Sequence, residues 1–455
     1  MSKTLRPETT ELEIPVSELR IGMHVIRLDK PWEETDFLMQ GFFIHSLDDI
    51  DAVRSQCQTV VIEGKAGRPD KNATESRRKP VSNRFMRFFA KKAHAGDKGP
   101  GRDRHSRPET ETGAAPPTRV SYINKVQVFD EMSSARPAYN EARALAKSVM
   151  AGLRVGRAID LNEAKKVVND CVDSILRNED ALLLLTKLKD KDEYTAEHSL
   201  NVSILSAAFG KHLGMLEEEI RTLGLCGLLH DVGKARVPDE ILKKPGSLTP
   251  QEYAIMRKHA TWGRDILMAV PKITHATIDV AYNHHERLDG KGYPLGIKAT
   301  QIPYLAKVVA IVDTYDAISS SRAYGAARSS MEALKIIHRS RDGQFDSELT
   351  REFVLMVGIY PPGSIVEMTN GEVGIVIAAN PAIKRRPRVM LVADRNKAKH
   401  KSYRTIDLST KAADANGKAY VIAREVPDKT HGVSLKDYLE EGLVLGRTVS
   451  EDITP

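Results

Sequence analysis

The chain has 455 residues, of which 41% are hydrophobic and 28% are charged. It is too long for one ordinary hydrophobic core and too apolar to be wholly disordered, so we expect two to three domains. No apolar run approaches the roughly 18 residues that a membrane-spanning helix requires, and charges among the first residues disfavour a signal peptide. We therefore expect a cytoplasmic protein with no transmembrane segment.

The cysteine content limits the kinds of site that the chain can build. Cys57, Cys171 and Cys226 are odd in number and far apart in the sequence. This usage excludes both a disulfide scaffold and a CxxC metal knuckle. A metal site in this protein must therefore use histidine and carboxylate ligands.

The formal net charge of +7 would suit a nucleic-acid-binding protein, but the excess is local. Residues 65–118 contain 14 Lys and Arg against 6 Asp and Glu, a surplus of 8, which leaves −1 for the rest of the chain. The same segment is rich in glycine and proline and cannot bury enough apolar surface to order itself. We predict a basic flexible linker and no specific nucleic-acid partner.

Inside this linker, residues 84–92 place aromatic side chains among cations. Such a segment could contact an acidic partner or a membrane surface, although a solvated linker with a short helix is the favoured interpretation. Protein partners could bind through the linker or through the N-terminal domain. The sequence is silent on the oligomeric state.

The segments on either side of the linker differ in pattern. Residues 12–16, 23–28 and 59–62 read as strands, and a capping box at Ser46–Asp49 predicts a helix that ends near Cys57. Together these elements predict a small α/β domain.

After the linker, the pattern becomes helical. Residues 129–192 are rich in Ala, Leu, Lys and Glu, which predicts long helices. Gly214 is expected to end one helix, and Thr249–Glu252 offers an N-cap, a proline at the first helical position and a glutamate at the third. These signals predict a helical bundle that continues to about Gly358.

Strand patterns return near the end of the chain, at residues 365–369, 373–378, 389–392 and 419–423, with an Asn370–Gly371 hairpin turn. The predicted fold is thus multidomain, with an all-α helical core between a small α/β domain and a small antiparallel β module. The proposed boundaries are 1–64 for the α/β domain, 65–118 for the linker, 119–190 for a helical connecting region, 191–358 for the helical core domain and 359–455 for the β module.

Histidine and aspartate recur in the helical core at intervals of 32, 29, 25 and 28 residues. A helix with its return loop has about this length, so ligands spaced in this way can converge at one level of a bundle. Imidazole and carboxylate ligands without thiolate suit iron, manganese, zinc or nickel. The candidate ligands are His198, His230, Asp231, His259, His284, His285 and Asp313.

Each of these residues alone has a simpler interpretation. A single histidine on an amphipathic helix is usually a core or boundary residue with satisfied hydrogen bonds, and we assign that role to His212, His275 and His338. Adjacent ligands, however, can reach two metals about 4 Å apart, and an aspartate next to a histidine can bridge them. Seven such residues at regular spacing therefore favour a binuclear metal site.

Two loops near these residues add further candidates. A glycine turn after His230 directs Lys234 back toward the metal ligands, where an ammonium group would meet a phosphate oxygen. A glycine-rich loop after His285 ends in Tyr293, whose ring suits a base or sugar at a pocket rim, although an ordinary surface loop is the alternative.

The phrases HDVGK, VPDEILKKPGSLT and HHERLDGKGYP and the stretch from Asp313 to Tyr324 occur in this order. This set resembles the HD family of metal-dependent phosphohydrolases, and within it the HD-GYP branch, the bacterial cyclic di-GMP phosphodiesterases. The resemblance covers residues 192–358. The first sixty residues, with LRIGMHVIRLDKPW and QGFFIHS, resemble the small uncharacterised domain that often precedes HD-GYP domains.

The resemblance implies a role for each candidate residue. Asp231 and Lys234 would be the catalytic residues, with Asp231 bridging two metals. One metal would be held by His198, His230, Asp231 and Asp313, and the second by His259, His284 and His285; Lys234, Asp316 and Arg322 would line the phosphate and guanine pocket, with Tyr293 at its rim.

Four positions depart from the family pattern, and one of them, Ser347 in place of the usual proline, is read as structural only. Members with three metals have a glutamate where this chain has Tyr194, which favours two metals here. Ala323 stands where proline is usual, and Gly325 stands where a basic residue that contacts substrate phosphate is usual, so one phosphate contact is weaker.

The function implied by the resemblance is hydrolysis of cyclic di-GMP to linear pGpG, with further cleavage to GMP as a second outcome. Two divalent cations, Fe or Mn with Zn or Ni as alternatives, would supply the nucleophile for in-line attack. The alternatives are a cyclic di-GMP receptor or signalling platform with weak catalysis, and a phosphodiesterase for another cyclic dinucleotide. Regulation through the N-terminal domain is a further hypothesis.

Overall fold

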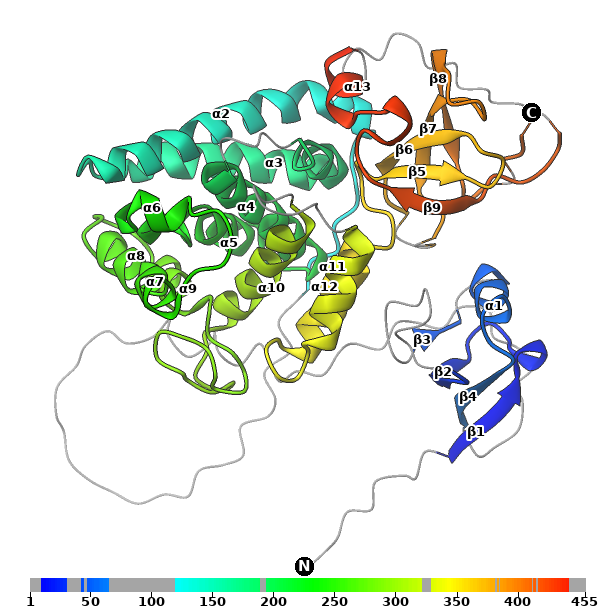
Figure 1. Ribbon diagram of the computed structural model, residues 1–455, viewed down its shortest axis with the longest axis horizontal. Coiled ribbons are helices and arrows are strands. Elements are labelled where there is room, and N and C mark those ends of the chain that lie inside the picture. Colours follow the sequence, from blue (N-terminus) through cyan, green and yellow to red (C-terminus); the bar gives the residue numbers. More distant parts are fainter. Residues whose placement is uncertain are drawn as a thin grey trace, which may run out of the picture.

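The structure of the protein is a computed structural model with helical, N-terminal and C-terminal parts (Figure 1). The residues it describes are 10–30, 42–44, 47–64, 119–188, 194–320, 329–380, 383, 385–410, 412–414 and 416–441. The predictions for the linker 65–118, for the capping residue Ser46 and for Arg322 and Gly325 lie outside the described residues. The predicted helical core with a small sheet domain on each side is present.

The N-terminal part is an antiparallel sheet of four strands in the order β1-β4-β2-β3. Its elements are β1 Thr10–Pro15, the 3-10 helix η1 Val16–Glu18, β2 His24–Leu28, β3 Phe42–Phe43, α1 Leu47–Arg54 and β4 Thr59–Gly64. Val25, Val53 and Val60 are fully buried in a core that belongs to this part alone. The predicted α/β domain is therefore confirmed, and only the two-residue strand β3 was missed.

The central part consists of helices that pack around α4 and α5 (Figure 1). In chain order the elements are α2 Val128–Arg154, α3 Leu161–Leu185, α4 Tyr194–His212, α5 Glu217–Leu229, the 3-10 helix η4 Val232–Arg236, α6 Asp239–Leu242, α7 Pro250–Met256, α8 His259–Met268, α9 His275–Asn283, α10 Tyr304–Ser319, α11 Ser330–Arg339 and α12 Ser347–Val357. In the described residues, no helix has the length and apolar character needed to cross a membrane.

Local signals set the ends of these helices. The Asp160 side chain accepts hydrogen bonds from two backbone N–H groups at the start of α3. Thr249 and Glu252 form the capping box expected before α7. Gly214 follows α4 with φ at +71°, a conformation that favours glycine, and its position against Val120 leaves no room for a Cβ atom. The predicted boundaries at Gly214 and at Thr249–Glu252 are confirmed, and the start of α3 at Asp160 is an addition from the structure.

Helix α4 lies at the centre of the bundle and is buried along nearly its whole length. Its apolar residues, such as Leu200, Ile204 and Phe209, share one hydrophobic core with helices on every side. Because α4 is surrounded, polar residues on it are buried as well, and His198 is one of them. A buried polar side chain needs a hydrogen-bond partner, so His198 is expected to face other polar groups inside the bundle.

The C-terminal part is an antiparallel sheet in the order β8-β7-β6-β5-β9. Its elements are β5 Ile365–Met368, β6 Val373–Ala378, β7 Arg388–Ala393, β8 Lys399–Asp407, β9 Ile422–Val426, the 3-10 helix η5 Thr430–Gly432 and α13 Leu435–Glu441. The predicted β module is present, but β8 was missed and the last strand begins three residues later than predicted. β8 is a polar edge strand in which Ile406 is the single buried residue, so no continuous buried face marks it in the sequence.

This sheet packs onto the helical part and shares its core. Arg136 on α2 donates a hydrogen bond to the backbone oxygen of Leu439 in α13, and Asp180 on α3 accepts one from the backbone of Ala379. The sheet therefore lies against the ends of α2 and α3, away from the end of the bundle where α7, α8 and α9 lie (Figure 1).

All three cysteines are buried free thiols. Burial raises the pKa of the Cys57 thiol to about 11 and those of Cys171 and Cys226 to about 12. These thiols are therefore protonated at neutral pH, and neither candidate metal cluster in the described part of the chain includes a cysteine.

Candidate metal centre

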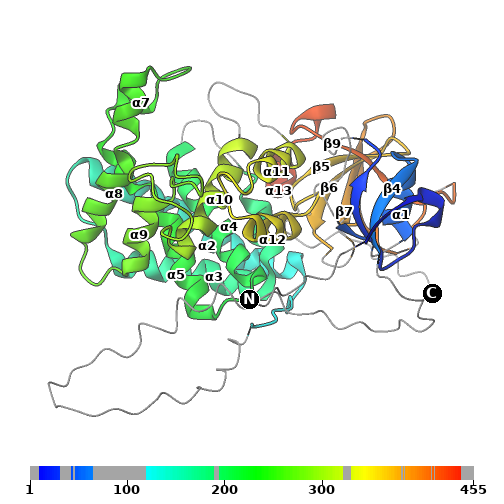
Figure 2. The same ribbon diagram turned by 90° about the horizontal axis from the view of Figure 1, so that it is seen from below.

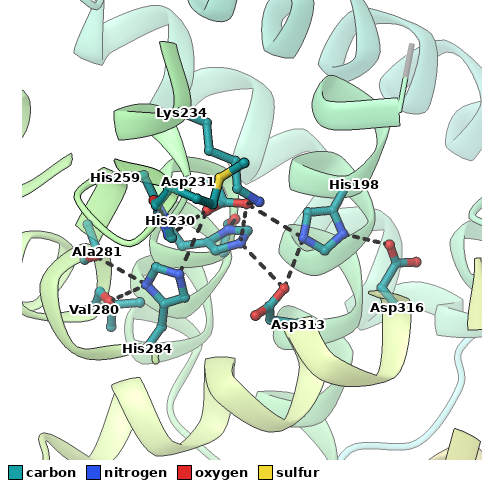
Figure 3. Close-up of polar contacts among 12 residues, drawn as sticks. His198, His230, Asp231, Lys234, His259, Val280, Ala281, His284, Asp313 and Asp316 are labelled. Carbon is teal, nitrogen blue, oxygen red and sulfur yellow. Dashed lines mark hydrogen bonds and ion pairs between the residues drawn. The ribbon is translucent and has the colours of Figure 1, made fainter. Parts of the chain in front are cut away.

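Five helices bring the seven predicted ligands together, and Figure 3 labels all of them except His285. His198 lies in α4 and Asp313 in α10, so both are held by the buried interior of the bundle. The remaining ligands lie at helix ends: His230 and Asp231 follow α5, His259 begins α8, and His284 and His285 follow α9.

The seven residues form two clusters of ligand atoms. In each cluster the ligand atoms lie within 4.8 Å of one another; the first consists of His198, His230 and Asp313, and the second of Asp231, His259, His284 and His285. These clusters divide the seven residues as the sequence predicts, except that Asp231, expected with the first set as a bridge between two metals, groups with the second.

Asp231 lies between the two clusters, and its two oxygens face different ligands. Oδ2 lies 3.2 Å from Nε2 of His230 and 3.7 Å from Nε2 of His198. Oδ1 lies 3.4 Å from Nε2 of His259 and 3.7 Å from Nε2 of His284. A carboxylate in this position can bridge two cations, one in each cluster.

Backbone carbonyls orient three of the histidine rings. Nδ1 of His230 donates to the oxygen of Gly227 at 2.7 Å, and Nδ1 of His259 donates to that of Met256 at 2.7 Å. Nδ1 of His284 faces two carbonyl oxygens of α9, each at 3.1 Å (Figure 3). With the proton on Nδ1, the lone pair on Nε2 points into the site, which is the arrangement of a metal-bound histidine.

Several atoms that point into the site lack hydrogen-bond partners. Among the described residues, no partner is found for Nε2 of His230, His259 and His284 or for Oδ1 of Asp231, and all four atoms are buried. Buried acceptors without a donor destabilise a fold, and their convergence here is explained if cations occupy the space between them. The residues present therefore fit divalent metals, as HD domains bind them.

Asp316 lies elsewhere than expected. The sequence placed it in the substrate pocket, but it is buried behind His198, with Oδ2 at 2.8 Å from Nδ1 of that ring. Its other oxygen accepts a hydrogen bond of 3.3 Å from Asn201. Since Asp313 and Asp316 are three residues apart on α10, both carboxylates face the same side of the helix and hold the His198 ring between them.

The electrostatics of the site separate His198 from the other histidines. Burial alone would lower the pKa of His198, but the hydrogen bonds that its ring donates to Asp313 and Asp316 raise it to about 9. Burial lowers the pKa of His284 to about 3, and it also lowers the pKa values of His259 and His285. These three imidazoles are therefore neutral at physiological pH, which is the form that binds metals.

The two aspartates remain ionised. Burial would raise the pKa of Asp231, but Lys234 and then His230 hold it well below its usual range. Burial likewise opposes ionisation of Asp313, and the hydrogen bond with His198 lowers the pKa of Asp313 below its usual range. Two carboxylates together with the neutral imidazoles of His259, His284 and His285 suit cations of the first transition series.

Lys234 lies beside the bridging carboxylate, as its spacing predicted. It belongs to η4, and its ammonium group donates a hydrogen bond to Oδ2 of Asp231. A glycine precedes it because η4 is pressed against the start of α8: a Cβ atom on Gly233 would lie 1.9 Å from the backbone oxygen of His259. The role of Gly233 was missed, and the glycine in the HDVGK phrase was its only signal.

Tyr293 lies next to the second cluster. Its ring stacks on that of His285, with centroids 4.6 Å apart and an angle of 29° between the planes. The loop that carries it is held by Glu286, which is buried and accepts hydrogen bonds from the backbone of Leu295, Gly296 and Ile297. Glu286 was also missed, although an acid directly after two ligands is a recognisable signal.

The histidines assigned to ordinary roles lie outside both clusters. His212 pairs with Glu352 at 3.1 Å on the outside of α4. His275 begins α9, and His338 lies in α11. Among the described residues, neither of the two candidate metal clusters includes any of the three.

Comparison with known proteins agrees with this arrangement. Residues 182–349 match the model of the HD domain, residues 11–164 match a domain of unknown function (DUF3391), and residues 365–420 match a KOW domain associated with the HD domain. The chain is 34% identical over 380 residues to the protein named cyclic di-GMP phosphodiesterase PA4108 of Pseudomonas aeruginosa, which covers 83% of this chain and 84% of that protein.

Two further similarities are more limited in extent or strength. The protein named 3'3'-cGAMP-specific phosphodiesterase 1 of Vibrio cholerae is 36% identical over 170 residues, or 37% of this chain and 39% of that protein. A solved structure of an HDG"Y"P protein from Bdellovibrio bacteriovorus is 16% identical with a TM-score of 0.42, over 76% of this chain and 98% of that chain.

The chain belongs to the HD-GYP family of HD-domain phosphodiesterases. Its N-terminal part is the uncharacterised domain that the first sixty residues resembled. The C-terminal sheet, predicted only as a β module, corresponds to a KOW domain.

Proposed function

We propose that the protein hydrolyses cyclic di-GMP to linear pGpG and thereby lowers the level of a bacterial second messenger. The observation that carries the proposal is the position of Asp231, whose two oxygens face two separate clusters of buried ligands. A receptor that only binds a dinucleotide has little need for a carboxylate between two metal sites. A hydrolase needs one because it positions two cations on one scissile phosphate.

The proposed ligand sets are His198, His230, Asp231 and Asp313 for one metal and Asp231, His259, His284 and His285 for the other. When bound, two cations would supply an activated water near neutral pH and neutralise charge on the phosphoryl oxygens. Iron or manganese is the proposed metal, with zinc or nickel as alternatives, because all proposed ligands are imidazole or carboxylate. The number two rests on Tyr194, which stands where family members with three metals have a glutamate.

The chain's own residues then bind and orient the substrate. Lys234 donates to Asp231 now and can reach a phosphate oxygen, where its charge stabilises the developing anion or assists the leaving oxygen. Tyr293 forms part of the pocket rim beside His285. For Asp316 we replace the expected substrate contact by the role of orienting His198. Arg322 stays a prediction.

A second candidate substrate is another cyclic dinucleotide. A protein named as specific for 3'3'-cGAMP is 36% identical to this chain over 170 residues, or 37% of its length. This similarity is the reason to test 3'3'-cGAMP as a substrate. The third candidate is a receptor with weak catalysis. Gly325 favours it, because a basic residue that contacts substrate phosphate is usual at this place in the sequence. Each candidate gives a different product pattern.

The test is a hydrolysis assay with anaerobically purified protein whose metal content has been measured. We expect wild-type protein to retain about two metal ions per chain and to convert cyclic di-GMP to pGpG, with or without further cleavage to GMP. Asp231→Ala is expected to lose metal and activity together. A correctly folded Asp231→Ala protein with full hydrolysis would refute the proposal, and chromatography with 3'3'-cGAMP as substrate would separate the alternatives.

Regulation through the N-terminal domain is a separate part of the proposal. That domain has its own core, so it can be removed without opening the helical core. Deletion of residues 1–118 is expected to change the rate or the substrate affinity. Unchanged kinetics after the deletion would remove the N-terminal domain and the linker from the proposal.

A further inference from the structure

Helix α7 carries an aromatic side chain that the core does not use. The helix projects from the body of the bundle (Figure 2), and none of its residues is buried. Tyr253 is a large aromatic residue on this helix, and it is 49% exposed. The capping box and the ion pair between Lys244 and Glu252 at 2.6 Å fix the start of the helix, so Tyr253 is presented in a defined position.

Arg257 connects this tyrosine to the metal centre. Its guanidinium carbon lies 5.9 Å from the ring centroid of Tyr253 and 4.8 Å from that of Tyr293. On its other side, Tyr293 stacks on the ligand His285 at 4.6 Å. The four side chains therefore form a continuous series of stacked groups that runs from a candidate metal ligand to the exposed surface of α7.

The donors of Arg257 are not engaged. Its side chain is exposed, and in the described part of the chain neither a carboxylate within ion-pair distance nor a hydrogen bond from its guanidinium is found. Arg264 on α8 shows the contrast: it also lies over a tyrosine ring, Tyr282 at 4.5 Å, but its donors bond to Asp265. A guanidinium held by stacking but left with free donors is suited to a planar acceptor from outside.

We propose that Arg257 is a substrate-binding residue that recognises a guanine base, with Tyr253 and Tyr293 as the stacking surfaces around it. This inference rests on the proposed function. It adds that Arg257, Tyr253 and Tyr293 bind the base of the substrate. Guanine presents O6 and N7 as two adjacent acceptors, which match the two parallel donors of an arginine, whereas adenine presents a donor in place of O6.

The aromatic neighbours favour a base over a second phosphate. A phosphate needs charge but no stacking surface, whereas tyrosine rings beside an arginine, here the exposed Tyr253 and the half-buried Tyr293, suit a base. The ammonium of Lys234 instead lies at Asp231, which is where the proposed function places the phosphate.

The test compares Arg257→Ala and Arg257→Lys with the control Arg264→Ala. The measurements are metal content, kcat and KM for cyclic di-GMP, and the inhibition constant of cyclic di-AMP. We expect Arg257→Ala to raise KM for cyclic di-GMP about ten- to hundredfold, the usual value of a bidentate arginine–guanine pair, with metal content and kcat within twofold. The inhibition constant of cyclic di-AMP is expected to stay within twofold.

Arg257→Lys keeps the charge but loses the two parallel donors, so it is expected to behave like Arg257→Ala. Arg264→Ala is expected to match wild type, because its donors are already used by Asp265. If Arg257→Ala weakens cyclic di-GMP and cyclic di-AMP equally and Arg257→Lys restores both, the residue contacts phosphate and the inference is wrong. Unchanged KM would also overturn it.

Failure of the proposed function has a different signature. Wild-type protein that binds labelled cyclic di-GMP without hydrolysing it would refute the hydrolase while the affinity of Arg257→Ala still tests guanine recognition. Wild-type protein that neither binds nor hydrolyses cyclic di-GMP would overturn both.

Discussion

Nδ1 of His198 lies 2.8 Å from a carboxylate oxygen of Asp316, while Nε2 of the same ring lies 2.9 Å from Asp313. One helix, α10, thus supplies both a candidate metal ligand and the group that orients another ligand on α4. A carboxylate behind a metal-binding histidine fixes the ring and raises its basicity. The arrangement makes the first cluster depend on Asp316, which belongs to neither candidate metal cluster.

Asp316→Ala is therefore expected to weaken binding of one metal about ten- to hundredfold and to leave the other metal in place. Asp316→Asn keeps an acceptor for Nδ1 of His198 and is expected to lose less metal affinity than Asp316→Ala. Calorimetric titration of metal-free protein with Mn²⁺ measures both affinities. Asp265→Asn, at an exposed ion pair on α8, is the control. Two unchanged affinities in Asp316→Ala would contradict this prediction.

The two clusters are expected to lose metal separately. His198→Ala removes a ligand from the first cluster only, and His285→Ala removes one from the second only. Each of these two variants should retain about one metal ion, where wild type holds about two. Asp231→Ala should bind both metals less completely, because Asp231 is a proposed ligand of both. Metal analysis by mass spectrometry after anaerobic purification checks the stoichiometry. Loss of both metals from His285→Ala would mean that the clusters bind cooperatively as one site.

Lys234→Met is expected to lower kcat about a hundred- to a thousandfold while metal content stays at the wild-type level, because the ammonium stabilises charge on the phosphate in the transition state. Steady-state kinetics with cyclic di-GMP and metal analysis of the same sample give both values. Lys243→Met, at an exposed ion pair with Asp239 on α6, is the matched control and should retain wild-type kinetics. Loss of metal from Lys234→Met would instead show that Lys234 holds Asp231 in position for metal binding.

Gly233→Ala is expected to destabilise the protein by more than about 3 kcal/mol and to reduce metal binding. The added Cβ would lie 1.9 Å from the backbone oxygen of His259, so either η4 or the start of α8 must move. Gly343→Ala is the control, since nothing lies within 4 Å of its Cβ position. Thermal unfolding and metal titration compare the two variants. Equal stability of the two would show that this contact relaxes without cost.

The C-terminal sheet is expected to lose stability in acid through Glu367 on β5. Hydrogen bonds from Lys397 and then Arg424 lower the pKa of Glu367 from 4.5 to about 2. Because folding lowers this pKa, the stabilisation is fully present above the ordinary value and is lost as the pH falls toward about 2.

We expect Glu367→Gln to cost about 1 kcal/mol at neutral pH, a value reduced by solvent screening of Lys397 and Arg424. Its difference from wild type should shrink steadily below pH about 4.5. Thermal unfolding of both proteins across this range measures the difference. A difference that is constant with pH would show that the carboxylate charge does not matter.

Much of the fold follows from signals that act over a few residues. The start of α7 depends on Thr249 and Glu252, which cap it locally, and the end of α4 depends on the left-handed Gly214. Such contacts form between neighbours in the chain, so the sequence alone predicts them. Strand β8 lacks a local signal because its alternation is polar on both faces, and only pairing with β7 makes it a strand.

The candidate ligands themselves were predictable because residue type and helix-length spacing are written in the chain, and all seven converge as expected. What each neighbouring side chain faces was decided by packing between helices that are distant in sequence. Asp316 contacts His198 across 118 positions, and Gly233 meets the backbone of His259. Contacts of this kind depend on how α4, α8 and α10 pack together, which no local periodicity specifies.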